Sequence, residues 1–376
     1  MKRILLYLLA LAPLSLFAQG GQLNGTGFYR VQNSDTKRYL SIVDDHAYRV
    51  GTDVDLKAMI MRAENVFDTE VACNPATICY IEMISSSALN LIGQGLNLSD
   101  YGYYLNVMEK NNGSYVLYGS TSGISLYLLD NTRSYSPMTM QGGTTGKRNW
   151  WFLPVDQSDS QYFGVMPDVT ASVDGSYWAT MYAGFPFKPS AATTKVYTVS
   201  KVDNALGCAV ITEITDNIPA QTPVLFRCGS ATPIGNKLTL LDQSTSGSVG
   251  TNYLNGNYYC NDVEYTAERN HRNVKEYNPS TMRMLGTTAD GKPAFVKSNI
   301  QYLPANKCYL AVNASTAPDV LKIMTEAEYE AYVTGIEQIT TFTTDGTKVI
   351  YDLQGRRVQA PSKGLYIVNG KKMIIR

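Results

Sequence analysis

Short apolar runs separated by turn residues make up most of the chain. In the segment "RYLSIV", apolar and polar residues alternate with a period of two, which predicts a half-buried β-strand. Similar runs follow one another between residues 25 and 155, and Gly, Asn, Ser or Asp separates them. Many short strands at regular spacing are typical of a β-barrel or a β-sandwich. The pattern therefore predicts an all-β protein.

Two segments break this pattern and favour helices. The segment 52–67 has apolar residues at a loose helical spacing, and Thr52 can cap its first turn. The segment "TEAEYEAYV" predicts a short helix, in which Thr325 and Glu328 form a capping box by bonding each other's backbone N–H groups.

A second group of predicted strands lies between residues 162 and 324. Two of its segments, "NIPAQTPVLF" and "YLPANKCYL", place a proline just before a strand, where its missing N–H costs no sheet hydrogen bond. Strands with one apolar face favour an antiparallel β-sandwich. Together with the short helix at its end, this predicted domain covers residues 162–334.

The last segment, residues 335–376, forms a third predicted unit. It holds "KVIYDLQGRRV" and "GLYIVNGKKMIIR", which indicate short strands joined by tight turns. Gly355 and Gly370 stand at the expected turns. We expect a small β tail.

The first 18 residues have the layout of a secretory signal peptide. Lys2 and Arg3 precede an apolar run, and the small residue Ala18 ends the segment. The run is shorter than the ~20 residues that a membrane-spanning helix needs, although an N-terminal anchor is the alternative. We therefore expect a protein exported through the periplasm to the cell surface or the medium.

Composition narrows the class of partner. The chain has 32 Lys and Arg against 32 Asp and Glu, so its net charge is zero. Nucleic-acid-binding proteins usually carry a basic patch and a high pI, so a nucleic-acid partner is not expected. No later stretch is long and apolar enough to predict a membrane span after the signal is removed.

Six cysteines raise the question of disulfides, since exported proteins meet an oxidising compartment. Cys73 and Cys79 flank the short loop "NPATI", and we predict a disulfide between them, with free thiols as the alternative. The pairing of the others stays open, and buried thiols are the competing interpretation for Cys208, Cys228, Cys260 and Cys308.

No catalytic or metal-binding motif is recognisable. The two histidines, His46 and His271, stand in polar turn-like segments, and no C-x-x-C spacing suggests zinc. G-x-S-x-G, H-E-x-x-H, P-loop and dinucleotide-binding motifs are all missing from the sequence. We predict no catalytic residue, metal or cofactor, but a pair of carboxylates distant in sequence stays open.

Residues 25–155 resemble the ricin-type β-trefoil modules of secreted proteins from Bacteroides-type bacteria. The opening "GFYRVQNSDTKRYLSI" and the later "YYLNVMEKNNGSYVLYG" are similar to strand pairs of that family. "NWWFLPV" resembles its closing Q-x-W strand, with Asn149 in the glutamine position and Trp151 as the aromatic residue. The resemblance implies a β-trefoil fold, glycan recognition and a core position for Trp151. The following β-sandwich domain resembles a module that commonly accompanies the trefoil, and it implies no activity.

One short segment combines residue types suited to sugar binding. Sugar sites pair an aromatic face with a few orienting polar groups. The segment "SDYGYYLNV" offers Asp100, Tyr101, Tyr103 and Asn106 as candidate ligand-binding residues. The alternative is that these are solvated turn residues beside a core formed by Tyr104 and Leu105.

The end of the chain resembles the C-terminal sorting tail of the type IX secretion system. The motif consists of Pro361, Gly364, Tyr366, Val368, Gly370 and Lys371. The resemblance implies a small Ig-like β fold that is recognised by the outer-membrane export machinery. A simple hairpin that covers a sheet edge is the alternative.

These observations lead to three functional hypotheses. The first is an exported, non-enzymatic binding or surface protein that recognises glycans through the trefoil-like domain. The second is a secreted glycan-degrading hydrolase whose carboxylates are scattered in sequence. The third is a purely structural or adhesive surface component.

Overall fold

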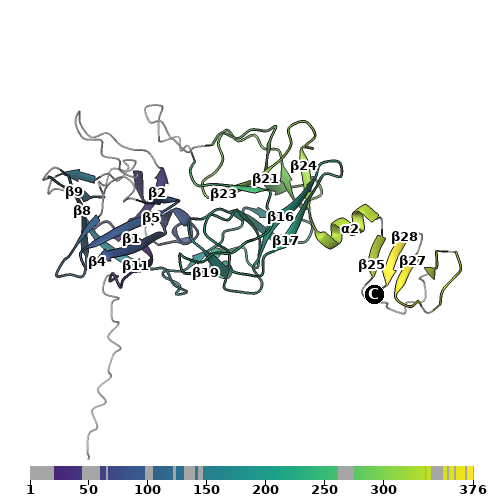
Figure 1. Cartoon of the computed structure of the whole chain (residues 1–376), viewed down its shortest axis with the longest axis horizontal. Coiled ribbons are helices and arrows are strands. Elements are labelled where there is room, and N and C mark those ends of the chain that lie inside the picture. Colours follow the sequence, from purple (N-terminus) through teal and green to yellow (C-terminus); the bar gives the residue numbers. More distant parts are fainter. Residues whose placement is uncertain are drawn as a thin grey trace, which may run out of the picture. The chain divides into compact units, whose positions relative to one another are not determined.

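The computed structural model consists mainly of β-strands in several sheets, with few helices (Figure 1), which confirms the all-β prediction. The chain divides into two compact units, residues 1–71 with 76–155, and residues 72–75 with 156–376. No helix in the described ranges is both long and apolar enough to cross a membrane. The structure describes residues 21–44, 60–64, 67–97, 105–121, 124–130, 140–142, 147–260, 275–334, 336–339, 350–353, 355–359, 361–368 and 371–375.

The first unit is built around a closed ring of strands. Six strands pair antiparallel in the order β1–β4–β5–β7–β8–β11, and β11 pairs with β1 to complete the ring. β2 and β3 extend from β1, β9 and β10 extend from β8, and β6 pairs with β5. The strands are β1 (Gly27–Asn33), β2 (Tyr39–Asp44), β3 (Ile60–Glu64), β4 (Cys79–Ser85), β5 (Ala88–Gly93), β6 (Leu96–Asn97), β7 (Leu105–Glu109), β8 (Tyr115–Thr121), β9 (Ile124–Leu128), β10 (Met140–Gly142) and β11 (Asn149–Pro154).

Aromatic side chains fill the inside of this ring. The Phe152 ring centroid lies 5.9 Å from that of Tyr29 and 5.4 Å from that of Tyr115, both in edge-on contacts. Trp150 is fully buried, and its indole N–H donates to the carbonyl of Leu128 at 3.1 Å. Trp150 and Phe152, two positions apart on β11, thus share the face that points to the core.

Trp151 is not the core residue that the sequence predicted. It pairs opposite Gln32, whereas Trp150 pairs opposite Asn33, so the two tryptophans lie on opposite faces of β11. The Trp151 side chain is half-buried, and the Lys37 ammonium lies 3.7 Å from its ring centroid. The register between β1 and β11 gives the core position to Trp150 instead.

The helix predicted over residues 52–67 is wrong where the structure describes it. Ile60–Glu64 is strand β3, in which Arg62 pairs opposite Ser41 of β2. Without β3, the outer backbone groups of β2 would have no partner in this sheet, and pairing outweighs a weak helical spacing. Residues 52–59 lie outside the described residues.

The predicted disulfide between Cys73 and Cys79 is not formed, and all six cysteines are thiols. The intervening chain folds into the short helical turn η1 (Pro75–Thr77), just after helix α1 (Thr69–Ala72). Cys79 begins β4 at a fully buried position opposite Tyr29. Burial raises the pKa of the Cys79 thiol to about 12, which disfavours the thiolate that disulfide exchange requires.

The second unit contains a large sheet in the order β13–β14–β18–β16–β17–β24–β22–β21–β23–β20, and a small one in the order β12–β19–β15. Among the described pairs of these two sheets, β17 and β24 run parallel and the others antiparallel, which departs from a purely antiparallel sandwich. The strands are β12 (Phe163–Gly164), β13 (Val169–Thr170), β14 (Tyr177–Met181), β15 (Phe187–Pro189), β16 (Lys195–Asp203), β17 (Cys208–Glu213), β18 (Val224–Cys228), β19 (Lys237–Leu240), β20 (Leu254–Asn257), β21 (Met282–Thr287), β22 (Pro293–Val296), β23 (Lys307–Ala311) and β24 (Val320–Thr325). A helical turn, η3 (Pro233–Asn236), precedes β19.

One apolar cluster unites the large sheet. Trp178 of β14, next to the edge strand β13, and Leu254 of β20, at the other edge, both belong to it, together with Phe295 of β22. The sheet therefore curls around a shared core and does not remain open.

The short helix predicted near residue 325 is confirmed as α2 (Glu326–Thr334), including its capping box. The backbone N–H of Thr325 donates to the Glu328 carboxylate at 2.7 Å, and that of Glu328 donates to the Thr325 hydroxyl at 3.3 Å. The Tyr329 hydroxyl also donates to the Asp203 carboxylate at 2.7 Å, which attaches α2 to the end of β16.

The tail contains its own four-stranded sheet in the order β25–β28–β27–β26. Its strands are β25 (Ile336–Ile339), β26 (Ile350–Tyr351), β27 (Gly364–Val368) and β28 (Lys371–Ile375). β26 and β28 pair antiparallel with β27, and β25 pairs parallel with β28. Gly355 has a φ of 80° in a turn closed by the Asp352 carboxylate and the Arg356 N–H, so the turn predicted there is present.

The two tryptophans provide a test of the register of β11. We expect Trp150→Ala to lower the free energy of unfolding by about 3–5 kcal/mol, because it leaves a cavity inside the ring. Trp151→Ala is the matched control and should cost about 1 kcal/mol, since its side chain is half-buried on the outer face. Calorimetric unfolding of the full chain measures both. A larger loss for Trp151→Ala would contradict the assignment.

Candidate functional site

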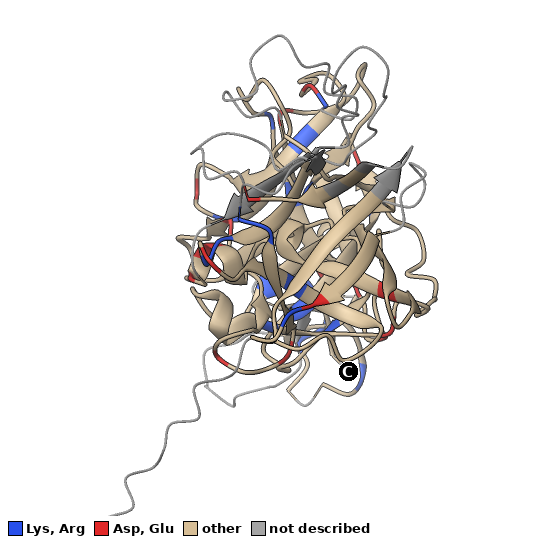
Figure 2. Cartoon of the chain, turned by 90° about the vertical axis from the view of Figure 1, so that its left-hand side faces the viewer, with Lys and Arg blue, Asp and Glu red and all other residues tan. Residues whose placement is uncertain are grey.

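The distribution of charged residues does not single out a surface, because basic and acidic residues are interspersed over the described strands and loops (Figure 2). Within the described ranges, no group of three or more His, Cys, Asp and Glu side chains is placed to hold a metal ion. A different distinction is informative. Buried polar side chains with satisfied hydrogen bonds serve the fold. Partly exposed polar side chains without a protein partner bond to water, and a ligand can replace that water.

Asn106 is the one predicted ligand-binding residue that the structure describes, because Asp100, Tyr101 and Tyr103 lie outside the described residues. Asn106 is half-buried on β7, where it pairs opposite Ala88 of β5 and Tyr118 of β8. Because β7 lies between β5 and β8, strand pairing on both sides fixes the backbone position of Asn106.

Asn106 belongs to a row of side chains that crosses three strands. Tyr118 of β8 pairs opposite both Asn106 and Tyr127 of β9, and directly paired residues point to the same face of a sheet. The two tyrosine ring centroids lie 5.9 Å apart. The guanidinium carbon of Arg148, just before β11, lies 5.0 Å from the Tyr127 ring centroid. We call these four residues the Asn106 row.

The Asn106 row lies on the outer face of the ring sheet. Leu105 and Leu117, the neighbours of Asn106 and Tyr118 along their strands, are fully buried and face the core. All four side chains of the row are half-buried. Within the part of the chain that the structure describes, none of them forms a hydrogen bond or an ion pair. An amide, two hydroxyls and a guanidinium are therefore available together.

Other polar groups of the first unit are already engaged in the fold. The buried Asp130 carboxylate accepts from the Thr36 hydroxyl at 2.5 Å and from the Arg38 guanidinium at 3.2 Å. The Asn33 amide donates to the carbonyl of Lys147 at 2.9 Å. These bonds fix the turn between β1 and β2 and leave little for a ligand.

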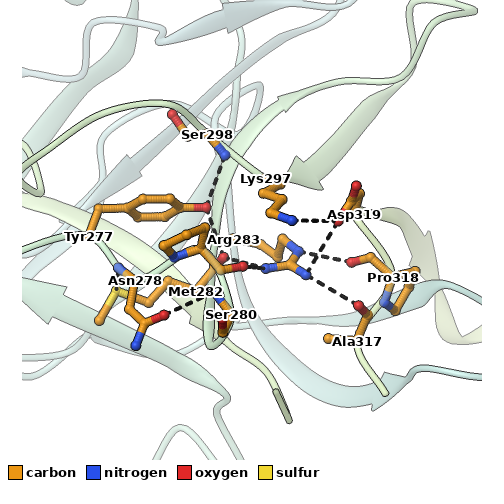
Figure 3. Close-up of polar contacts among 11 residues, drawn as sticks. Tyr277, Asn278, Ser280, Met282, Arg283, Lys297, Ser298, Ala317, Pro318 and Asp319 are labelled. Atoms are coloured by element: carbon orange, nitrogen blue, oxygen red, sulfur yellow. Dashed lines mark hydrogen bonds and ion pairs between the residues drawn. The ribbon is translucent and has the colours of Figure 1, made fainter. Parts of the chain in front are cut away.

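In the second unit, Arg283 is a buried polar side chain whose hydrogen bonds likewise hold the fold (Figure 3). Its side chain is almost fully buried, and its guanidinium donates to backbone carbonyls. The acceptors are Pro318 at 2.8 Å, Pro279 and Met282 at 2.7 Å, and Ala317 at 3.3 Å. Arg283 thus ties two loops together, and the Tyr277 hydroxyl reinforces one of them by donating to the Met282 carbonyl at 2.9 Å.

A second polar cluster of this unit surrounds the ion pair between Asp168 and Lys307, whose atoms lie 2.6 Å apart. The same carboxylate accepts from the Thr180 N–H at 2.8 Å. Burial raises the pKa of the Cys228 and Cys308 thiols nearby to about 12. Both thiols therefore remain protonated at neutral pH and contribute packing, not nucleophilicity.

The residues of the sorting-like motif gather in the tail hairpin. Gly364, Tyr366 and Val368 alternate along β27, so they share one face, and Val368 is buried. Val368 pairs opposite Lys371 at the start of β28. Pro361 precedes β27, and Gly370 lies outside the described residues.

Sequence reasoning missed Tyr118, Tyr127 and Arg148. The alternation in "SYVLYG" and "SLYLL" places each tyrosine on a strand, which is the signal that could have selected them. Their meeting with Asn106 depends on the register of three strands and on the path of the chain before β11. Neither follows from local alternation.

No protein-family model, curated protein or solved structure matches this chain. The functional argument therefore rests on the geometry of the described residues.

The structural role of Arg283 can be tested directly. We expect Arg283→Leu to lower the free energy of unfolding by about 2–4 kcal/mol, because it removes a buried guanidinium and leaves the partly buried carbonyl groups of two loops without their donor. Arg227→Leu is the matched control, since Arg227 is half-exposed and its ion pair with Asp174 is 3.7 Å long. Urea unfolding of both variants should show a large loss for the first alone. Equal small losses would show that Arg283 does not hold the loops.

Proposed function

We propose that this chain is an exported, non-enzymatic binding or surface protein that recognises glycans through the Asn106 row. The observation that carries the proposal is the set of partly exposed amide, hydroxyl and guanidinium groups without partners in the described structure. Aromatic faces pack against the C–H groups of a sugar ring, and a few planar polar groups orient its hydroxyls. Tyr118 and Tyr127 supply the faces, and Asn106 supplies an orienting amide.

The first unit, in this proposal, is a ricin-type β-trefoil. A β-trefoil consists of a six-stranded barrel and three hairpins, arranged as three successive four-strand repeats. The ring of β1, β4, β5, β7, β8 and β11 supports this assignment, as do the outlying pairs β2–β3 and β9–β10. Three successive segments contribute two strands each to the ring, as in a trefoil. The pairs are β1 and β4, β5 and β7, and β8 and β11.

The remaining parts of the proposal concern export. The first 18 residues act as a signal peptide, and the tail is a small Ig-like sorting domain read by the type IX machinery of the outer membrane. The tail's strands pair with one another within the described residues, which supports a separable unit. Tyr366, which is partly exposed on β27, is the side chain of the motif that such a machine would contact.

A glycan-degrading hydrolase and a structural or adhesive component are the competing hypotheses. A bound glycan that is cleaved over time would favour the hydrolase. Failure to bind any glycan would favour the structural component.

A glycan array tests the binding function. We expect the mature protein, residues 19–376, to bind a subset of glycans, and Tyr118→Ala to weaken this binding about tenfold or more, because it removes the central aromatic face. Tyr253→Ala is the matched control, since Tyr253 is an exposed tyrosine of the second unit, with 44% of its surface accessible. Equal binding by both variants would exclude the Asn106 row as the site.

Deletion of residues 335–376 tests the tail. We expect the shortened protein to keep its other sheets, as measured by circular dichroism, and to accumulate in the periplasm, as measured by cell fractionation. The same retention should follow Tyr366→Ala but not Tyr351→Ala, since Tyr351 lies outside the motif on β26. Arrival of the shortened protein at the cell surface would assign the tail a structural role.

A further inference from the structure

Arg148 adds a positive charge to one end of the Asn106 row. Its guanidinium carbon is held 5.0 Å from the Tyr127 ring centroid by a cation–π contact. This contact fixes the position of the charge but does not neutralise it. Among the described residues, no carboxylate lies within ion-pair distance of Arg148.

Two other arginines of the described structure have carboxylate partners. Arg38 faces Asp130 at 3.2 Å, and Arg227 faces Asp174 at 3.7 Å. Arg227 is an informative comparison, because its guanidinium also lies over an aromatic ring, 5.9 Å from the Trp178 centroid. Stacking on a ring is therefore compatible with a carboxylate partner, and Arg148 lacks one.

An anion is the kind of group that could pair with the Arg148 guanidinium. A planar guanidinium binds a carboxylate or a sulfate through two parallel N–H donors, a geometry that lysine does not offer. The rest of the row offers two aromatic faces and an amide, which suit a sugar ring and its hydroxyls. Building on the proposed function, we infer that the ligand is an acidic glycan whose carboxylate or sulfate pairs with Arg148.

The dimensions of the row fit a short, extended saccharide. Neighbouring strands lie about 4.8 Å apart, so β7 and β9 are separated by about 10 Å. The anionic sugar lies at the Tyr127 and Arg148 end, and the following sugars extend across Tyr118 toward Asn106. The backbones of β7, β8 and β9 hold these positions through their ladder of hydrogen bonds.

The test compares matched acidic and neutral probes on the mature full-length protein. One pair is oligogalacturonate and its methyl ester, which differ only in the carboxylate charge. The other is a sulfated galactan oligosaccharide and its desulfated form. We expect the protein to bind the acidic member of one pair about tenfold more tightly than the neutral member, and to lose this preference at high salt. The pair that shows the preference identifies the anion.

Arg148→Gln should weaken binding of the acidic probe more than binding of the neutral probe and so remove the preference, whereas Arg227→Gln should keep the preference. Circular dichroism shows whether each variant is folded, and Arg148→Lys separates charge from the forked geometry if the glutamine variant is unstable. Equal binding of acidic and neutral probes would overturn the acidic-glycan inference but leave the proposed function intact. If no probe and no array glycan binds, both are wrong.

Discussion

Strand β11 pairs with β1 on one side and with β8 on the other, and the first unit depends on this double pairing. It closes the ring, so that none of the six ring strands is left as an open edge. It also sets which side of β11 faces inward, and thus buries Trp150 among the ring's aromatic residues. Arg148 immediately precedes β11, so the same closure brings its guanidinium to Tyr127.

Arg283 and Asp130 on the one hand, and the Asn106 row on the other, have different physical roles. Arg283 and Asp130 are almost fully buried, and their hydrogen bonds hold turns and loops that would otherwise be free to move. The Asn106 row is only half-buried, and water can satisfy its groups when no ligand is bound. A ligand that replaces this water with matched groups gains affinity without rearranging the sheet.

Alternation and turn residues were sufficient to predict strands, and the capping box at Thr325 was readable because its signal is local. The features that failed depend on partners distant in sequence. The register with β1 places Trp150, and not Trp151, in the core. Residues 60–64 form a strand because they pair with the backbone groups of β2. Asn106 was found from local composition, but Tyr118, Tyr127 and Arg148 join it only through pairing between strands. The disulfide between Cys73 and Cys79 was predicted from an oxidising export route and a short loop, and neither carries information about the burial of Cys79.

All six cysteines are described, and none is cross-linked. Cys79 and Cys308 lie in the cores, where their sulfur atoms act as small apolar groups. The native fold thus takes its stability from burial and backbone pairing, and not from covalent constraints on the unfolded chain. The described fold therefore requires no disulfide, and a reducing agent would remove no cross-link from it.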